Sequence, residues 1–268
     1  MPESATYTHG HPASVLRSHN WRTADNSAAY LLPHLREDMN LLDIGCGPGT
    51  VTLGLAERLP AGRVTGIDIA PEVVELARGA AQMAGATNVH LAVGDALCLD
   101  FPDKSFDVVH AHQVLQHLAD PVAGLREMRR VCRPGGLVAA RDGDFEKMTW
   151  YPEEAALRRW VEIYCSVARA NGGEPDAARR LWAWARAAGL PEITPSASAW
   201  CFATDEDRHW WSEVWADRIS NTQLADRAIE LKLADREELK EIAQAWSHWA
   251  SIPDACFLVL QGEILCRT

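Results

Sequence analysis

The stretch that decides the fold is LLDIGCGPGT, residues 41–50. A short apolar run, LLDI, ends directly in a loop with three glycines at alternating positions. Glycine adopts positive φ without strain and lets a ligand approach the main chain closely. Residues 50–59 then have helical spacing, with Val51, Leu55 and Leu59 on one face. The stretch therefore predicts a strand, a ligand-binding turn and a helix in succession.

The alternation of strand and helix continues to about residue 142. The apolar runs predict further strands at 63–69, 88–95, 105–111 and 136–142, with helices at 71–84 and 120–132. Proline at the start of 71–84 suits a first helical position. Short apolar runs between amphipathic helices are typical of a parallel sheet covered on both faces. We therefore predict an α/β fold.

The pattern changes after residue 145. Helices are predicted at about 152–170 and 174–188, a strand within 189–204, a polar helical insertion at 205–250 and a last strand at the end of the chain. The helical pieces would cap one edge of the sheet. The predicted division is an arm and helix at 1–38, a cofactor-binding core at 39–145, and caps with the last strands at 146–268.

Length and composition narrow the class of protein. A chain of 268 residues fits one large α/β domain. A net charge of -11 argues against nucleic acid as a partner. Seven cysteines without a C-x-x-C pair indicate reduced thiols rather than disulfides or a zinc site. No apolar run reaches the roughly 18 residues of a membrane helix. We expect a cytoplasmic protein without a metal or a membrane span, and a homodimer stays open.

The glycine loop and the acids around it point to one ligand. Its G-x-G-x-G spacing differs from the dinucleotide fingerprint, and no Lys-Ser/Thr follows as in a P-loop. Asp43, just before the glycines, would repel a pyrophosphate but attract an ammonium group. Asp68 and Asp95 end the next two strands, where carboxylates can accept from ribose hydroxyls and an adenine amino group. S-adenosylmethionine (SAM) carries all three groups, and its carboxylate suits a helix N-terminus.

Four segments together carry a family resemblance. DIGCGPGT, GIDIAPEVVELAR, GDALCLDFPDKSFDVVHAHQVLQHLADP and LREMRRVCRPGGLVA resemble class I SAM-dependent methyltransferases, nearest to the small-molecule enzymes of the ubiquinone- and menaquinone-biosynthesis type. The resemblance covers about residues 40–142. It implies a Rossmann-like sheet of seven mostly parallel strands, in the order 3-2-1-4-5-7-6, with the last strand antiparallel. It also implies cofactor contacts from Asp43, Gly45, Gly47, Asp68, Asp95, Ala96, and His112 or Gln113.

The N-terminal segment resembles the arm with which a subset of this family covers the cofactor. On it, Tyr7 would cap the methionine end of SAM and Arg22 would pair with the cofactor carboxylate. The alternative is a solvated tail followed by a packing helix from Ala24 to Leu35. We also expect cofactor contacts from Cys46, Ile69 and His117.

Methyl transfer from a sulfonium is an in-line displacement, so positioning supplies most of the rate. Polar candidates for the reaction follow two strands and lie on the arm: His112, Gln113, Gln116, His117, Asp142, Asp144, His9, His11 and His19. Of these, His112 and Asp142 are predicted to lie near the substrate in catalytic positions.

Tryptophan gives the best indication of the substrate. Apart from Trp21, all of the eleven tryptophans lie at or after residue 150. Aromatic walls are typical of pockets for apolar or planar molecules, although such residues also pack helices on a sheet. The sequence predicts methyl transfer to a carbon or oxygen of a small, largely apolar or aromatic metabolite, with S-adenosylhomocysteine as product. The alternative is a SAM-binding enzyme of the same fold with a non-methylating reaction such as a cyclisation.

Overall fold

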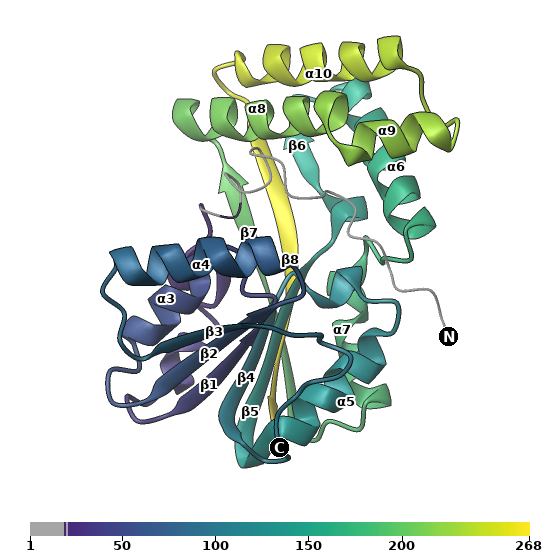
Figure 1. Cartoon of the computed structure of the whole chain (residues 1–268). Helices are drawn as coiled ribbons and strands as arrows, with labels where there is room; N and C mark the ends of the chain where they lie inside the picture. Colours follow the sequence, from purple (N-terminus) through teal and green to yellow (C-terminus); the bar gives the residue numbers. More distant parts are fainter. Residues whose placement is uncertain (1–18, 20) are drawn as a thin grey trace.

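The structure, a computed structural model, describes residue 19 and residues 21–268. Figure 1 shows an α/β core and a helical cap, with the long strands β7 (Ile193–Phe202) and β8 (Cys256–Arg267) running from one to the other. The cap lies beyond the end of the core sheet, and its helices α8 (Asp205–Asn221) and α10 (Arg236–Ala250) lie side by side.

Five parallel strands form the first part of the sheet. In chain order they are β1 (Asn40–Ile44), β2 (Arg63–Asp68), β3 (Val89–Val93), β4 (Phe106–His112) and β5 (Cys132–Gly143). Their spatial order is β3-β2-β1-β4-β5. The first four agree with the predicted strands within two residues. β5 begins earlier than predicted, because Cys132 pairs with Phe106 before the register shifts and resumes at Leu137.

The remaining strands complete the sheet from the C-terminal half. β8 runs antiparallel to β5, and β7 pairs with β8 along nearly its whole length. The short β6 (Thr149–Tyr151) pairs with the start of β8, beyond the end of β5. With β6 set aside, the order is β3-β2-β1-β4-β5-β8-β7. The predicted seven-stranded order, with an antiparallel last strand, is therefore confirmed.

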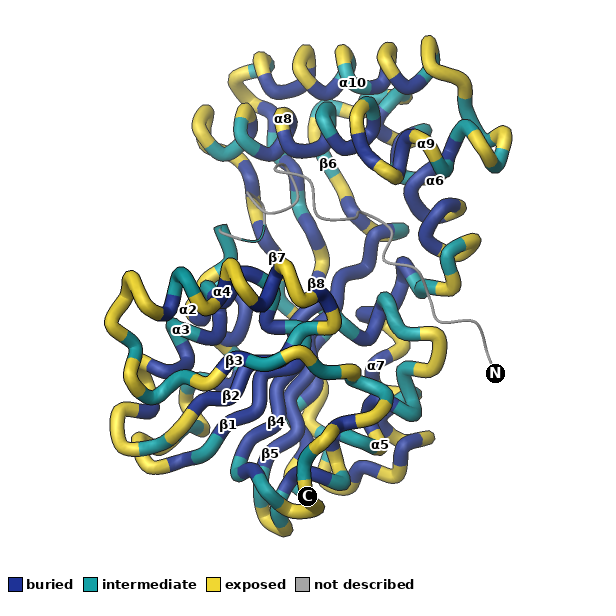
Figure 2. The backbone as a smooth tube through the Cα atoms, in the orientation of Figure 1, coloured by how far each residue is buried: buried dark blue, intermediate teal, exposed yellow. Residues whose placement is uncertain are grey.

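Helices cover both faces of the sheet. Near one face lie α3 (Thr50–Glu57) and α4 (Pro71–Met83), and on the other lie α5 (Pro121–Val131) and α7 (Ala177–Ala187). Adjacent residues of β1 show the alternation, since Leu41 packs with α3 and Leu42 packs with α5. Figure 2 shows the resulting burial of β1, β4 and β5. The ligand-binding edge is thus held by strands that are buried on both sides.

The cap has an aromatic core of its own. It combines α6 (Ala155–Ala170), α8, α9 (Gln223–Glu230) and α10. Four of its tryptophans are fully buried: Trp160, Trp215, Trp246 and Trp249. Of the two helices predicted at 152–170 and 174–188, only the first joins this cluster, because α7 packs on β5 and β8 instead.

The segment before β1 does not form the continuous helix over 24–35 that the sequence offered as an alternative. It holds α2 (Ala24–Ser27) and the short 3-10 helix η1 (Leu32–His34). Ala28 leaves the helical conformation, and Pro33 disfavours helical geometry in the residue before it. Further 3-10 turns are η2 (Leu115–His117) and η3 (Phe145–Lys147). Within the described residues, no helix is long and apolar enough to span a membrane.

Candidate active site

A cavity of about 220 Å³ lies where the carboxyl ends of β1, β2, β3 and β4 face the cap. This is the edge at which open parallel sheets bind ligands. The cavity is lined by every predicted cofactor residue that the structure describes: Arg22, Asp43, Gly45, Cys46, Gly47, Asp68, Ile69, Asp95, Ala96, His112, Gln113 and His117. The predictions for Tyr7, His9 and His11 lie outside the described residues.

The glycine loop needs glycine for two separate reasons. Gly45 and Gly47 have φ values of 66° and 55°, in the left-handed region. A Cβ atom on Gly45 would also lie 2.4 Å from a methyl carbon of Val114. The loop is fastened to the next strand by Asp68, whose carboxylate accepts from the Gly47 amide at 3.0 Å and the Ala70 amide at 3.1 Å. The carboxylate that ends β2 is therefore held at the rim of the cavity.

Asp43 is a buried acid with two strong partners. One carboxylate oxygen accepts from the Thr52 hydroxyl at 2.6 Å, and the other lies 2.8 Å from Nδ1 of His110. Asp43 and His110 face each other in the register of β1 and β4. Sequence reasoning found Asp43 but missed both partners. The available signal was His110 itself, two residues before His112 and hence on the same face of the strand.

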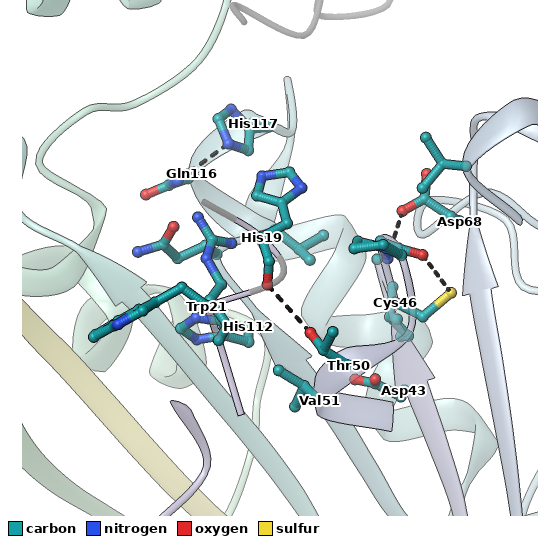
Figure 3. A pocket seen from close by; sticks show the side chains of 18 of the residues that line it. His19, Trp21, Asp43, Cys46, Thr50, Val51, Asp68, His112, Gln116 and His117 are labelled. Carbon is teal, nitrogen blue, oxygen red and sulfur yellow. Dashed lines mark hydrogen bonds between the residues drawn. The ribbon is translucent and has the colours of Figure 1, made fainter. Parts of the chain in front are cut away.

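The turn after β4 supplies the opposite wall. Gln113 has a φ of 53°, and its amide donates to the Arg141 carbonyl of β5 at 2.7 Å. In η2, Nε2 of Gln116 lies 3.1 Å from Nε2 of His117. In Figure 3, Asp68 and Cys46 lie on one side of the cavity and Gln116 and His117 on the other. The cavity thus separates an acidic strand-end side from a side rich in amides and imidazoles.

His112 is a polar side chain on this wall that forms no hydrogen bond with the described residues. It is 7% exposed, and neither ring nitrogen has a hydrogen-bond partner among the described residues. The centre of its ring lies 5.6 Å from the centre of the Trp200 ring. The Arg141 guanidinium lies over the same Trp200 ring, 4.9 Å from its centre. Burial, with the positive charges of Arg141 and Arg22, holds the pKa of His112 well below its usual range. The imidazole is therefore neutral at physiological pH.

Asp142, near the end of β5, and Asp144, which follows β5, do not line the cavity. Asp142 is fully buried and accepts from the Gln116 amide at 3.2 Å, so it lies behind that residue. Burial raises the pKa of Asp142 to about 8. Asp144 is held by the guanidinium of Arg179 at 2.7 and 2.8 Å. Asp142 thus lies behind the residues that line the cavity. Its direct contact with a substrate stays a prediction.

The cap and the arm close the cavity with aromatic side chains. They come from segments far apart in the sequence: Trp21, Phe145, Trp200, Trp210, Trp211 and Trp215. Trp21 packs against Trp200 and Trp210, with ring centres 5.2 and 5.5 Å apart. Among residue 19 and residues 21–268, no three His, Cys, Asp or Glu side chains could hold a metal ion.

Comparison with known proteins shows the family to which the chain belongs. A profile described as "Methyltransferase domain" matches residues 35–213. An uncharacterized methyltransferase of Schizosaccharomyces pombe is 35% identical, over 97% of this chain and 96% of that one. The chain belongs to the class I SAM-dependent methyltransferases.

Two further proteins are similar to different shares of this chain. A demethylmenaquinone methyltransferase of Listeria welshimeri is 38% identical over 112 residues, which are 41% of this chain and 48% of that enzyme. The crystal structure of the [4+2]-cyclase SpnF matches with a TM-score of 0.51 and 25% identity, over 93% of this chain and 79% of that one. The cofactor of the methyltransferase is SAM.

Sequence reasoning missed most of the cap side of the site in this methyltransferase. It expected a few tryptophans to line a pocket, and Trp200, Trp210, Trp211 and Trp215 do so. Which ones could not be read from their spacing, because β7 and α8 converge on the cavity only through the pairing of β7 with β8.

Proposed function

We propose that this methyltransferase transfers the methyl group of SAM to an oxygen or carbon of a small, largely apolar or aromatic molecule. The observation that carries the proposal is His112, a buried neutral imidazole on the cavity wall with no hydrogen-bond partner among the described residues for either nitrogen. Buried polar groups are nearly always hydrogen-bonded, so this one fits a bound acceptor. The aromatic cap supplies the rest of the acceptor pocket.

The residues at the strand ends fit SAM. The Asp68 carboxylate, already oriented by two amides, would accept from the ribose hydroxyls. Asp95, exposed after β3, would accept from the adenine amino group, and Ile69, 68% exposed at the cavity, would cover a face of the base. Asp43 would attract the ammonium group. The N-terminus of α3 and Arg22 would attract the carboxylate.

The segment before β1 would close over the cofactor. Its described part already lines the cavity with His19, Trp21 and Arg22. The His19 carbonyl accepts from the Thr50 hydroxyl at 3.2 Å, which ties the segment to the first turn of α3. Together with 39–145 as the cofactor-binding core and 146–268 as caps and last strands, these contacts support the division of the chain proposed from its sequence.

His112 would act on the acceptor rather than on the cofactor. SAM supplies an electrophilic methyl group on a sulfonium. The wall around His112 would hold an acceptor hydroxyl against the imidazole, which accepts its proton as the new bond forms. The Trp200 ring beside His112 and the cap aromatics would exclude water from this position. Because the pKa of His112 is low, we expect its contribution near the lower end of general-base effects, about 10²-fold.

The test measures methyl transfer and cofactor binding separately. Purified protein is incubated with methyl-labelled SAM and a panel of phenols, enols and aromatic carboxylic acids, and S-adenosylhomocysteine release is followed. His112→Gln should lower the rate about 100-fold while changing the SAM dissociation constant less than about threefold. His90→Gln, on the exposed side of β3, is the matched control and should keep the rate of the parent protein. An unchanged rate in His112→Gln would contradict the role of His112.

A second function has one specific observation in its favour. The crystal structure of the [4+2]-cyclase SpnF matches 93% of this chain at 25% identity. The aromatic cavity would then fold an apolar polyene, and SAM would stay bound without turnover. Conversion of a substrate with no release of S-adenosylhomocysteine would favour this function over methyl transfer.

A further inference from the structure

We propose that Cys201 and Cys256 form a dithiol site that reacts with small disulfides, such as glutathione disulfide, and closes into a reversible cross-link at the base of the cap. All seven cysteines are free thiols in the structure. These two differ from the others in lying together at the surface, outside the cavity that binds SAM. The proposal does not depend on the methyl acceptor.

The geometry brings the two sulfur atoms close. They lie 3.8 Å apart, at the point where β7 ends and β8 begins. Cys201 is opposite Leu258 in the register, so Cys256 is its diagonal neighbour on the same face of the ribbon. A disulfide bond measures about 2.05 Å, so the two sulfur atoms must approach each other further for the bond to form.

The chemistry needs one small disulfide and no metal. The Cys201 thiolate attacks one sulfur of glutathione disulfide, forms a mixed disulfide and releases one glutathione thiolate. The Cys256 thiolate then attacks the Cys201 sulfur and releases the second glutathione. The protein loses two electrons and two protons, and glutathione disulfide gains them as two thiols. Cys201 is the first nucleophile because it is the exposed one, and burial raises the pKa of Cys256.

The position of the pair gives the cross-link a structural consequence. Cys201 precedes the segment 202–255 that contains α8, α9 and α10, and Cys256 follows it. The end of β7 and the start of β8 lie side by side below α8 (Figure 1). A disulfide would join the two points at which this part of the cap leaves and re-enters the sheet. It would therefore restrain opening of the cap, whose residues Trp211 and Trp215 line the cavity.

The experiment is a redox titration of the full chain. Protein is equilibrated in glutathione buffers of increasing oxidised fraction, quenched, alkylated and mapped by mass spectrometry. We expect one intramolecular cross-link between the peptides of Cys201 and Cys256, fully reversed by dithiothreitol. The oxidised protein should melt about 5 °C higher than the reduced protein, an order of magnitude set by closure of a loop of this length. Amides of α8 and α10 should exchange more slowly in the oxidised form.

Matched variants separate this pair from other thiols. Cys201→Ser and Cys256→Ser should each abolish the cross-link and the melting shift. Cys98→Ser, which removes a separate exposed thiol, should keep both. Mapping of the unsubstituted protein tests the pairing even where a serine variant folds poorly. The proposal is overturned if full oxidation leaves Cys201 and Cys256 alkylatable, or if they form only mixed or intermolecular disulfides.

Discussion

Replacing Asp68 by asparagine tests how the cofactor end of the site works. The carboxylate accepts two amide hydrogen bonds, from Gly47 at 3.0 Å and Ala70 at 3.1 Å, and its remaining lone pairs face the cavity. Asparagine keeps one acceptor oxygen but turns an N–H₂ group toward one of these donors. If the Asp68 carboxylate binds the ribose as proposed, the variant loses a charge-assisted bond to it, and it also sets two donors against each other.

The size of the effect on binding follows from the first of these losses, because the clash of donors is present with and without ligand and therefore lowers stability instead. A hydrogen bond to a charged group contributes about 1.5–3 kcal/mol. The dissociation constant for S-adenosylhomocysteine should therefore rise about 10- to 150-fold.

Isothermal calorimetry with S-adenosylhomocysteine and with its 2′-deoxy analogue measures the effect and its cause. If Asp68 binds the ribose, the parent protein should lose affinity for the analogue, and Asp68→Asn should lose little more. Asp100→Asn, an exposed acid outside the cavity, is the control and should bind like the parent protein. Affinity within threefold of the parent in a folded Asp68→Asn variant would refute the reasoning.

Two further substitutions test the frame of the site. Gly45→Ala places a Cβ atom 2.4 Å from Val114 at a φ of 66°, so its free energy of unfolding in urea should fall by about 2–4 kcal/mol. The control Gly79→Ala, in open space on α4, should change the free energy of unfolding by less than about 1 kcal/mol. Asp142 has a pKa raised to about 8, so the folded state holds a proton that the unfolded state releases, and stability should fall by up to about 1.4 kcal/mol per pH unit as pH rises from about 5 to 8. Asp142→Asn should remove that slope in urea unfolding at pH 6 and pH 8, and an unchanged slope would assign it to another group.

The cofactor end of the site was predictable because its parts are local in the sequence. Asp43, Asp68 and Asp95 lie at or just beyond the carboxyl ends of β1, β2 and β3, and parallel strands bring these ends to one edge. Strand period and glycine spacing therefore predicted the α/β fold class and the acids that line the cavity, whereas the strand order came from the family resemblance. The same reasoning could not predict which of these side chains reach the cavity and which lie behind its wall. Asp142 also ends a predicted strand, yet its side chain lies behind Gln116, because the turn after β4 folds across the end of β5.

The cap was predictable in content but not in arrangement. The sequence predicted a helix at 152–170 and a helical insertion at 205–250, where the structure has α6 and then α8, α9 and α10. It assigned α7 to the cap as well, whereas the structure packs α7 against β5 and β8. Both kinds of helix have one apolar face, and the sequence does not say which surface covers it. The outcome depends on β8, which is long enough to serve the core sheet at one end and the cap at the other.

The two halves of the cavity therefore differ in what holds them. Contacts on the cofactor side join neighbouring strands, such as Asp68 with Gly47. Contacts on the acceptor side join distant segments, such as Trp21 with Trp200 and Trp200 with His112. Substitutions in the cap can reshape the acceptor pocket without touching the strand ends, because β7 and β8 alone carry α8, α9 and α10 away from the core sheet. Acceptor choice should accordingly be separable from SAM affinity, and a substitution of Trp200, whose ring contacts both His112 and Trp21, should act on acceptor choice.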